Sequence, residues 1–157
     1  MPLRLYVVRH AHAGDRAAWD GHDDLRPVSA KGRKQAARIA DMLEEGGVTR
    51  LVSSPARRCV QTFEPFAARR GLQIEVDERL AEGHRGEEAL AIVPPGDVDA
   101  ALATCSHGDV VMDMLRLVKA TGCKFDDPLV WPKASTWVVS SKGDRWASGR
   151  YLPPPRT

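Results

Sequence analysis

The most constraining feature of this sequence is the apolar run at its start. Residues from Leu3 to Val8 are aliphatic, aromatic or β-branched, interrupted only by Arg4. Such a run is typical of a strand buried on both faces, which belongs in the centre of a largely parallel sheet with helices packed on each side. The run ends at Arg9-His10, so two polar side chains come directly after the predicted central strand.

Further strands and helices alternate along the chain. Ser29 predicts the start of one helix, and Ser54-Pro55 predicts the start of another, which Pro65 should kink or divide. The remaining segments predict strands at 50–53, 73–76 and 101–106, helices at 87–93 and 110–121, and a closing hairpin with arms at 136–140 and 146–151. This alternation predicts an α/β fold, a three-layer αβα sandwich with a mostly parallel central sheet, helices on both faces and an antiparallel edge.

Length and composition limit the classes of protein to consider. The 157 residues predict one domain over 1–152 and a proline-rich, mobile tail at 153–157. No apolar run approaches the length of a membrane span, and the N-terminus lacks a signal-peptide pattern, which favours a cytoplasmic location. A net charge of +2 gives no footprint for nucleic acid or an anionic membrane. Cys59, Cys105 and Cys123 are expected to be reduced core thiols.

The carboxyl ends of the parallel strands predict where the chemistry lies, because ligands of open α/β sheets bind beyond them. Three segments follow such ends: His10, the turn from Ser54 to Arg58, and His107. Arg9 and Arg58 carry planar, permanently charged forks that can grip phosphate oxygens, and His107 offers a further donor. Repulsion from the arginines favours a neutral His10, which is the form that attacks phosphorus.

Two loops add to this prediction. Displacing an alkoxide requires a proton donor, and Glu82 lies in the polar segment 80–84, from which it could supply the proton. Residues 11–28 combine glycines, aspartates and a proline with little periodicity, so they predict a long loop. Loops of that length are often functional.

Four motifs along the chain resemble those of the histidine phosphatase superfamily, which includes the cofactor-dependent phosphoglycerate mutases. Residues 7–11, Val-Val-Arg-His-Ala, resemble its Arg-His-Gly nucleophile motif, with alanine replacing glycine as in small SixA-like phosphohistidine phosphatases. Residues 53–62 resemble the second signature, in which Arg58 rather than Arg57 matches the phosphate-binding arginine. Residues 80–84 resemble the proton-donor segment, and residues 106–108, Ser-His-Gly, resemble the second histidine motif.

The resemblance implies a mechanism that needs no metal and no organic cofactor. His10 attacks phosphorus, Glu82 protonates the leaving group, and water hydrolyses the phosphohistidine. Arg9, Arg58 and His107 hold the phosphoryl group. The implied activity is that of a phosphoric monoester hydrolase or a phosphohistidine phosphatase.

The same resemblance bears on the substrate. Residues 24–32 are similar to the Arg-Pro-Leu-Thr/Ser-x-x-Gly segment of the SixA-like branch, which makes Arg26 a further phosphate-binding candidate. Residues 134–138 resemble the phosphatase half of actinobacterial Nudix-phosphatase fusions, so nucleotide substrates stay open. The implied partner is a phosphorylated substrate, either a phosphoprotein, such as a carrier protein bearing phosphohistidine, or a small phosphate ester or nucleotide.

Three other functions use the same residues. His10 and His12 would lie on one face of a continuing strand, as a zinc hydrolase requires. A non-catalytic module would bind phosphate without turnover, and a mutase would pass the phosphoryl group from His10 to a second hydroxyl. His22 and His84, like His12, receive no role from the motifs, and Trp19 is the tryptophan of the long loop that could line a substrate groove.

Overall fold

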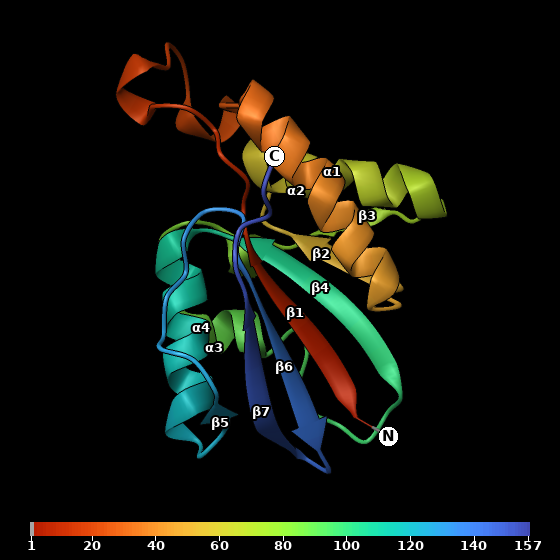
Figure 1. The fold of residues 1–157 in the computed structure, drawn as a ribbon. Coiled ribbons are helices and arrows are strands. Elements are labelled where there is room, and N and C mark those ends of the chain that lie inside the picture. The colour runs from red at the N-terminus through yellow and green to blue at the C-terminus, as the bar shows by residue number, and fades with distance from the viewer. Residues whose placement is uncertain (1) are drawn as a thin grey trace.

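The computed structural model describes residues 2–157, which form one sheet with the strand order β3-β2-β4-β1-β6-β7-β5 (Figure 1). Its strands are β1 Leu3–Arg9, β2 Arg50–Ser53, β3 Ile74–Val76, β4 Ala100–Ser106, β5 Lys124–Phe125, β6 Thr136–Lys142 and β7 Arg145–Leu152. Its α-helices are α1 Ala30–Glu45, α2 Arg57–Arg70, α3 Gly86–Leu90 and α4 Gly108–Ala120. Strands β1 to β4 run parallel, whereas β6 pairs antiparallel with both β1 and β7. The predicted α/β class, with a mostly parallel sheet and an antiparallel side, is confirmed.

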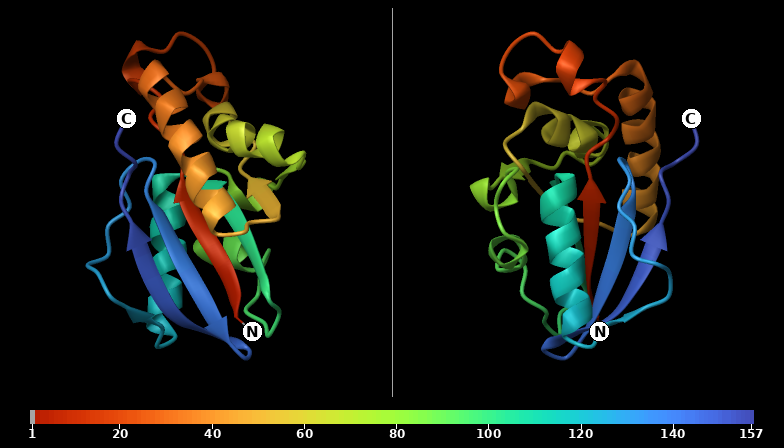
Figure 2. Two further views of the ribbon diagram at one scale, coloured as in Figure 1. Left: turned by 45° about the vertical axis from the view of Figure 1, so that its right-hand side comes forward. Right: turned by 90° about the vertical axis from the view of Figure 1, so that its left-hand side faces the viewer.

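Alternate side chains of β1 enter two separate cores, which explains why this strand is apolar along its length. Tyr6 and Val8 pack with residues of α1 and α2. Leu5 and Val7 pack with residues of α3 and α4. Figure 2 shows α1 and α4 on opposite sides of the sheet. The three-layer arrangement follows from this alternation, because each face of the strand needs its own cover of helices.

The start of α2 differs from the predicted start at Ser54-Pro55. The helix begins at Arg57, and its N-cap residue is Ala56, whose side chain makes no capping bond. Ser54 Oγ accepts a hydrogen bond from Ala56 N at 3.2 Å, just before the helix, and lies 2.8 Å from His107 Nε2. The serine that resembled a helix cap is thus engaged with the predicted site.

Pro65 does not divide α2, which is helical from residue 57 to residue 70. A proline inside a helix costs about 3 kcal/mol. The neighbouring Phe63 and Phe66 are 0% and 1% exposed in the core between α1, α2 and the sheet. Burying each phenylalanine contributes about 1.5–3 kcal/mol, so packing offsets the cost of the proline.

Other boundaries differ by a few residues. Helix α3 ends at Leu90 rather than at 93, and α4 begins at Gly108 rather than at 110. Strand β5 was not predicted, because its two residues are too few to show an alternating pattern; it pairs parallel with β7. Among residues 2–157, no helix has the length and apolar character needed to cross a membrane.

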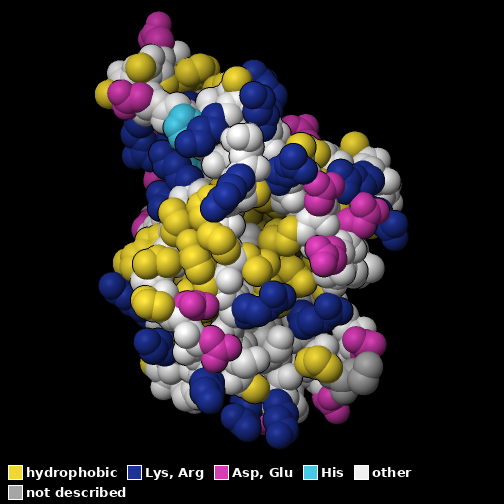
Figure 3. Space-filling model, viewed as in Figure 1, with side chains coloured by type: hydrophobic (Ala, Val, Ile, Leu, Met, Phe, Trp, Pro, Cys, Tyr) yellow, Lys and Arg dark blue, Asp and Glu magenta, His cyan; other side chains and the backbone are white. Residues whose placement is uncertain are grey.

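Two further segments lie at the end of the sheet where β1 and β7 end, because β6 runs antiparallel to both strands. The predicted loop 11–28 extends beyond the carboxyl end of β1 and contains two short 3₁₀ turns, η1 Arg16–Ala18 and η2 Asp23–Leu25 (Figure 2). Pro153 and Pro155 of the C-terminal segment line a small cavity with Ile39 of α1, and the mobility of residues 153–157 stays a prediction. Hydrophobic side chains gather across this part of the face in Figure 3.

Candidate active site

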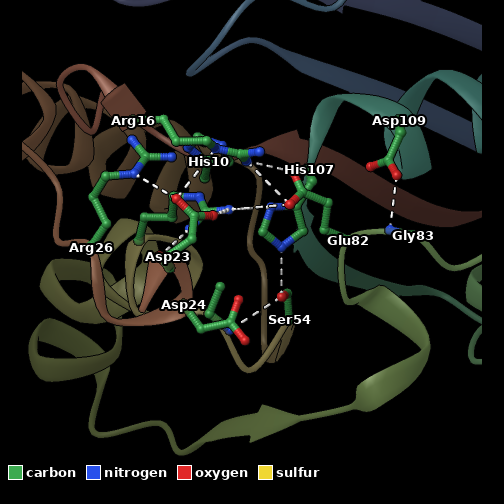
Figure 4. A network of polar contacts seen from close by, with 12 residues as sticks. His10, Arg16, Asp23, Asp24, Arg26, Ser54, Glu82, Gly83, His107 and Asp109 are labelled. Carbon is green, nitrogen blue, oxygen red and sulfur yellow. Dashed lines mark hydrogen bonds and ion pairs between the residues drawn. The ribbon is translucent and has the colours of Figure 1, made fainter. Parts of the chain in front are cut away.

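The predicted site residues lie together where three adjacent strands end. Strands β2, β4 and β1 are neighbours in the sheet, so the residues that follow them meet at one edge. Backbone bonds fix two of these segments to β4: His10 N donates to Ser106 O at 3.1 Å, and Ser54 N donates to Cys105 O at 2.9 Å. Figure 4 shows His10, His107 and Ser54 within one cluster of polar side chains.

His10 is buried and its tautomer is set by the backbone. Its Nδ1 lies 2.8 Å from the carbonyl oxygen of Ala11, which can only accept, so Nδ1 carries the proton and Nε2 keeps its lone pair. Burial lowers the pKa of His10 to about 3; the hydrogen bond with Ala11 opposes this shift, and electrostatic interactions with His107, Arg58 and Arg9 add to it. His10 is therefore neutral at neutral pH, the state in which an imidazole is a nucleophile.

His107 is held between a guanidinium and a hydroxyl. Arg58 Nη2 lies 3.2 Å from His107 Nδ1, and Ser54 Oγ lies 2.8 Å from His107 Nε2. Because a guanidinium can only donate, Nδ1 accepts and the ring proton sits on Nε2, directed at Ser54. The His107 and His10 rings meet edge to face with their centroids 5.6 Å apart. His107 thus orients Arg58 next to His10, and its predicted donation to phosphate stays a prediction.

Arg58 has no exposed surface and is paired with the long loop. Its Nη1 donates to the backbone oxygen of Asp23 at 2.9 Å, and its Nη2 lies 3.0 Å from Asp23 Oδ2. Arg58 Nε has no hydrogen-bond partner among residues 2–157. A buried N–H without an acceptor costs free energy, so this donor is suited to a ligand oxygen.

Asp23 is a site residue that the sequence analysis did not identify. Its carboxylate contacts three arginines: Arg26 Nε and Arg58 Nη2 at 3.0 Å, and Arg16 Nε at 3.3 Å. Burial raises the pKa of Asp23, but the hydrogen bond from Arg26 and the charges of the three arginines outweigh burial and hold the pKa below its usual value. Asp23 is thus an anion within the arginine cluster.

Arg9 lies against the start of α4. A Cβ on Gly108 would come within 2.8 Å of Arg9 Cζ, so the glycine leaves room for the guanidinium. Arg9 Nη1 donates to the backbone oxygen of Trp131 at 2.9 Å, whereas its buried Nε has no partner among residues 2–157. Burial lowers the pKa of Arg9, and the charge of Asp109 opposes that shift.

Glu82 joins the site from its loop, as Figure 4 shows. Its Oε2 lies 3.9 Å from Arg58 Nη2, and Arg16 Nη2 donates to its two oxygens at 2.8 and 3.1 Å. The adjacent Gly83 N donates to Asp109 Oδ2 at 2.9 Å, which ties the turn to α4. The structure therefore brings the predicted proton donor to the arginine that neighbours His10.

Arg26, the remaining predicted phosphate ligand, contacts the cluster from its outer side. Its side chain is buried, its Nε donates to Asp23 Oδ1 at 3.0 Å, and its Nη1 donates to the Ala13 carbonyl at 2.7 Å. In Figure 4, Asp23 lies between Arg26 and His107. Direct phosphate binding by Arg26 stays a prediction, and the contact that the structure shows is with Asp23.

The other histidines have partners of their own. His12 Nδ1 lies 2.7 Å from Ser29 Oγ, whereas His22 caps η2 and His84 pairs with Glu88. Within residues 2–157, no group of three or more His, Cys, Asp or Glu side chains is arranged to hold a metal ion. Cys59, Cys105 and Cys123 are free and buried, as the sequence predicted, and Cys59 Sγ lies 3.6 Å from His107 Nε2.

Arg16 and Asp23 gave little signal in the sequence because both lie in an aperiodic loop. The spacing of Asp23 and Arg26, three residues apart in a turn, is a weak sign of their ion pair. Nothing local predicts the contact of Arg16 with Glu82, because these residues are 66 positions apart.

Known proteins of similar sequence include phosphatases and mutases. An 8-oxo-(d)GTP phosphatase of Mycolicibacterium smegmatis is 29% identical over 96% of this chain, which corresponds to 48% of that protein. A probable phosphoglycerate mutase GpmB of Escherichia fergusonii is 36% identical over 54% of this chain and 40% of its own length. The chain therefore spans half or less of the length of these curated relatives.

Solved structures share the fold. A phosphohistidine phosphatase SixA described as putative, from Agrobacterium tumefaciens, matches with a TM-score of 0.73 and 23% identity over 96% of this chain and 98% of its own. The protein histidine phosphatase SixA complexed with tungstate matches with a TM-score of 0.72 and 18% identity over 96% and 94% of the two chains. The family model of the histidine phosphatase superfamily (branch 1) matches residues 5–91, more than half of the sequence. Together with the strand-end His10 and its arginines, this match shows that the chain belongs to the histidine phosphatase superfamily.

Proposed function

We propose that this protein is a metal-independent phosphatase that transfers a phosphoryl group to His10 and then to water. The observation that carries the proposal is the state of His10. It is neutral, its Nδ1 is bonded to the Ala11 carbonyl, and its unprotonated Nε2 belongs to a ring that neighbours the buried Arg58 and the half-buried Arg9. A histidine with this environment is suited to nucleophilic attack rather than to general acid chemistry.

The two arginines provide the complementary electrostatics. Arg9 Nε and Arg58 Nε are buried donors that lack acceptors among residues 2–157. Phosphoryl transfer places negative charge on three equatorial oxygens, and donors fixed in a buried site stabilise that charge better than water does. Phosphate oxygens would also satisfy these two donors, so binding offsets a cost already present in the folded chain.

The reaction has two steps. His10 Nε2 forms a bond to phosphorus while the bond from phosphorus to the leaving oxygen breaks, and protonated Glu82 gives its proton to that oxygen. Water then attacks the phosphohistidine, its proton passes to the Glu82 carboxylate, and the bond from His10 Nε2 to phosphorus breaks to release phosphate. Glu82 thus gives one proton and receives one in each cycle, so the two steps balance.

Phosphate esters are the substrate class that best explains Glu82. Phosphohistidine already has a good imidazole leaving group and needs less acid assistance than an ester does. A phosphohistidine protein remains the alternative suggested by the SixA-like fold. The two classes separate in the Glu82→Gln variant, which should lose much more activity on an ester than on a phosphohistidine peptide.

A nucleotide is a specific form of the ester hypothesis, and a groove next to Arg9 favours it. Leu129, Val130, Trp131 and Pro132 line this groove, whose volume is about 550 Å³. Apolar and aromatic walls beside a phosphate site suit the base of a nucleotide. The relative from Mycolicibacterium smegmatis, named an 8-oxo-(d)GTP phosphatase, is consistent with such a substrate.

The test is to follow phosphate release by wild-type and His10→Ala protein in the presence of a chelator. The substrates are p-nitrophenyl phosphate, a phosphohistidine peptide and a purine nucleoside triphosphate. The proposal expects release by wild type with at least one substrate, no release by His10→Ala, and unchanged release by His84→Ala, whose histidine pairs with Glu88. Activity retained by His10→Ala, or activity that needs zinc, would contradict the proposal. Phosphate binding without any turnover would indicate a non-catalytic module.

A further inference from the structure

Four charged side chains form a closed, alternating ring at the mouth of the site. Arg58 contacts Asp23 at 3.0 Å, Asp23 contacts Arg16 at 3.3 Å, Arg16 contacts Glu82 at 2.8 Å, and Glu82 lies 3.9 Å from Arg58. Of these residues, Arg16 has no role in the reaction described above. Figure 4 shows it between Asp23 and Glu82, above His10.

Glu82 needs a partner to stay in this position. Its side chain is 42% exposed and stands on a turn, where a free carboxylate would sample several rotamers. Gly83 N, bonded to Asp109, fixes the backbone of the turn and leaves the side chain free. Among residues 2–157, the hydrogen bonds to the Glu82 carboxylate come from Arg16 alone, whose Nη2 reaches both oxygens.

Arg16 is itself well placed for this contact. Asp15 is the N-cap residue of the turn η1. Its Oδ1 accepts a hydrogen bond from Ala17 N at 3.0 Å, so the backbone on both sides of Arg16 is fixed. The hydrogen bond with Glu82 raises the pKa of Arg16, so its charge is retained. At 58% exposure of the Arg16 side chain, an ion pair of this kind contributes little to stability.

We propose that Arg16 is a positioning residue that holds Glu82 beside Arg58, where Glu82 delivers its proton to the leaving group. This inference rests on the proposed function, because it gives Arg16 a role only through Glu82. It makes a specific prediction: the contribution of Arg16 to kcat/KM grows as the leaving group becomes poorer. An ester whose leaving group departs without a proton gains nothing from the contact.

A series of phosphate esters with different leaving groups tests this prediction. Phenyl phosphate has a poor leaving group, and 2,4-dinitrophenyl phosphate has a good one. For Arg16→Met, we expect kcat/KM on phenyl phosphate to fall about 10-fold and on the dinitrophenyl ester to change less than about 2-fold. Arg16→Lys, which keeps the charge and loses the planar fork, should recover part of the loss.

A double-mutant cycle tests whether Arg16 acts through Glu82. In the Glu82→Gln background, Arg16→Met should cause no further loss on phenyl phosphate, because the proton donor is already absent. Arg85→Met is the matched control, since Arg85 is an exposed arginine near the same turn that contacts Glu88 instead. It should match wild type on both esters.

Three outcomes would overturn the inference. An equal loss on both esters would show that Arg16 acts on the fold or on binding in general. An additive loss in the double variant would show that Arg16 acts on the substrate directly. If the wild type hydrolyses neither ester by way of His10, the proposed function fails, and this inference fails with it; in the first two cases the proposed function stands.

Discussion

The floor and the rim of the site differ in how they are built. The floor, defined as His10, His107 and Arg58, comes from residues that follow strands or begin a helix, and each is at most 4% exposed. The rim, defined as Arg16, Asp23 and Glu82, comes from loops, with side chains 29–58% exposed. The floor is held by the backbone and by burial, whereas the rim is held by ion pairs. Arg58 joins the two through its contacts with Asp23 at 3.0 Å and Glu82 at 3.9 Å.

Under the proposed function, this difference corresponds to a division of tasks within the site. A nucleophile and its phosphate donors must be fixed before substrate arrives, and buried positions at strand ends provide that order. A proton donor must exchange its proton with water, so an exposed loop suits it. Because each rim residue is paired with an opposite charge, the rim gains order without burial.

Replacing Arg58 with methionine tests whether the floor can lose function without losing its fold, and it has the largest expected effect. Loss of a buried donor to the phosphoryl group should lower kcat/KM on esters about 10³-fold. The free energy of unfolding should fall by less than about 2 kcal/mol, because methionine fills much of the volume and Asp23, which is partly exposed, keeps its contacts with Arg16 and Arg26. Steady-state kinetics and urea denaturation measure the two quantities.

The control for this variant is Arg57→Met, which removes the exposed arginine one position earlier in α2. It should match wild type in both measurements. If Arg58→Met unfolds while Arg57→Met does not, the charge of Arg58 is required for the fold, and the floor cannot be separated from the rim.

The same contrast explains what the sequence predicts. His10 and His107 are recognisable because they follow predicted strands, and periodicity reveals where a strand lies. Arg58 is distinguished from Arg57 by the resemblance to the family motif. Ser54 misled the prediction of α2, because a serine before a proline resembles a helix cap whether or not it bonds to a histidine 53 positions away. The continuity of α2 through Pro65 depends on Phe63 and Phe66 packing in a core that the local sequence does not show.

The rim could be predicted only in part. The polar segment 80–84 allows Glu82 as a proton donor, but the resemblance to a family motif is the stronger reason for choosing it. Arg16 and Asp23 lie in an aperiodic segment, and their roles depend on three-dimensional contacts with Glu82 and Arg58. Ion pairs between distant loops leave no spacing rule in a single sequence, in contrast to pairs within a helix.

The protonation of His10, a floor residue, should have the second-largest effect, which is on the pH dependence of the free energy of unfolding. The pKa of His10 is about 3 in the folded state, below the ordinary value of 6.5, so between these values the unfolded chain binds the extra proton. Stability is therefore fully retained above about pH 6.5 and falls as the pH drops toward 3, by up to about 1.4 kcal/mol per pH unit. When the pH falls from about 7 to about 5, protonation of His10 in the unfolded chain should lower the free energy of unfolding by about 2 kcal/mol.

The comparison with His10→Asn isolates this contribution, because asparagine can still donate to the Ala11 carbonyl and does not titrate. Denaturation of both proteins at the two pH values should show wild type losing about 2 kcal/mol more than the variant. Equal losses would show that His10 titrates in the folded state near its ordinary pKa, and the neutral nucleophile would then depend on pH in the working range.

The contact between Asp23 of the rim and Arg58 of the floor gives the smallest expected effect. It also distinguishes two possible roles of Asp23. Asp23→Asn removes the negative charge beside Arg58 and keeps one oxygen, which can accept from either Arg58 or Arg26, because these arginines contact different oxygens of Asp23. The site becomes more positive, so inorganic phosphate should inhibit about 3-fold more strongly, a modest change because solvent and salt screen the site. Stability should fall by about 1 kcal/mol, since the hydrogen bonds of two arginines lose a charged acceptor.

Competition by inorganic phosphate against p-nitrophenyl phosphate measures this effect, with Asp24→Asn as the control because Asp24 is exposed and lies near His22 rather than Arg58. Tighter inhibition in Asp23→Asn alone would mean that the Asp23 carboxylate competes with phosphate for Arg58. Weaker inhibition would mean that Asp23 holds Arg58 in its binding position. In the first case, the rim limits the affinity for phosphate and so favours product release. In the second case, burial alone does not preorganise the floor, and Asp23 would have to be counted as part of the floor.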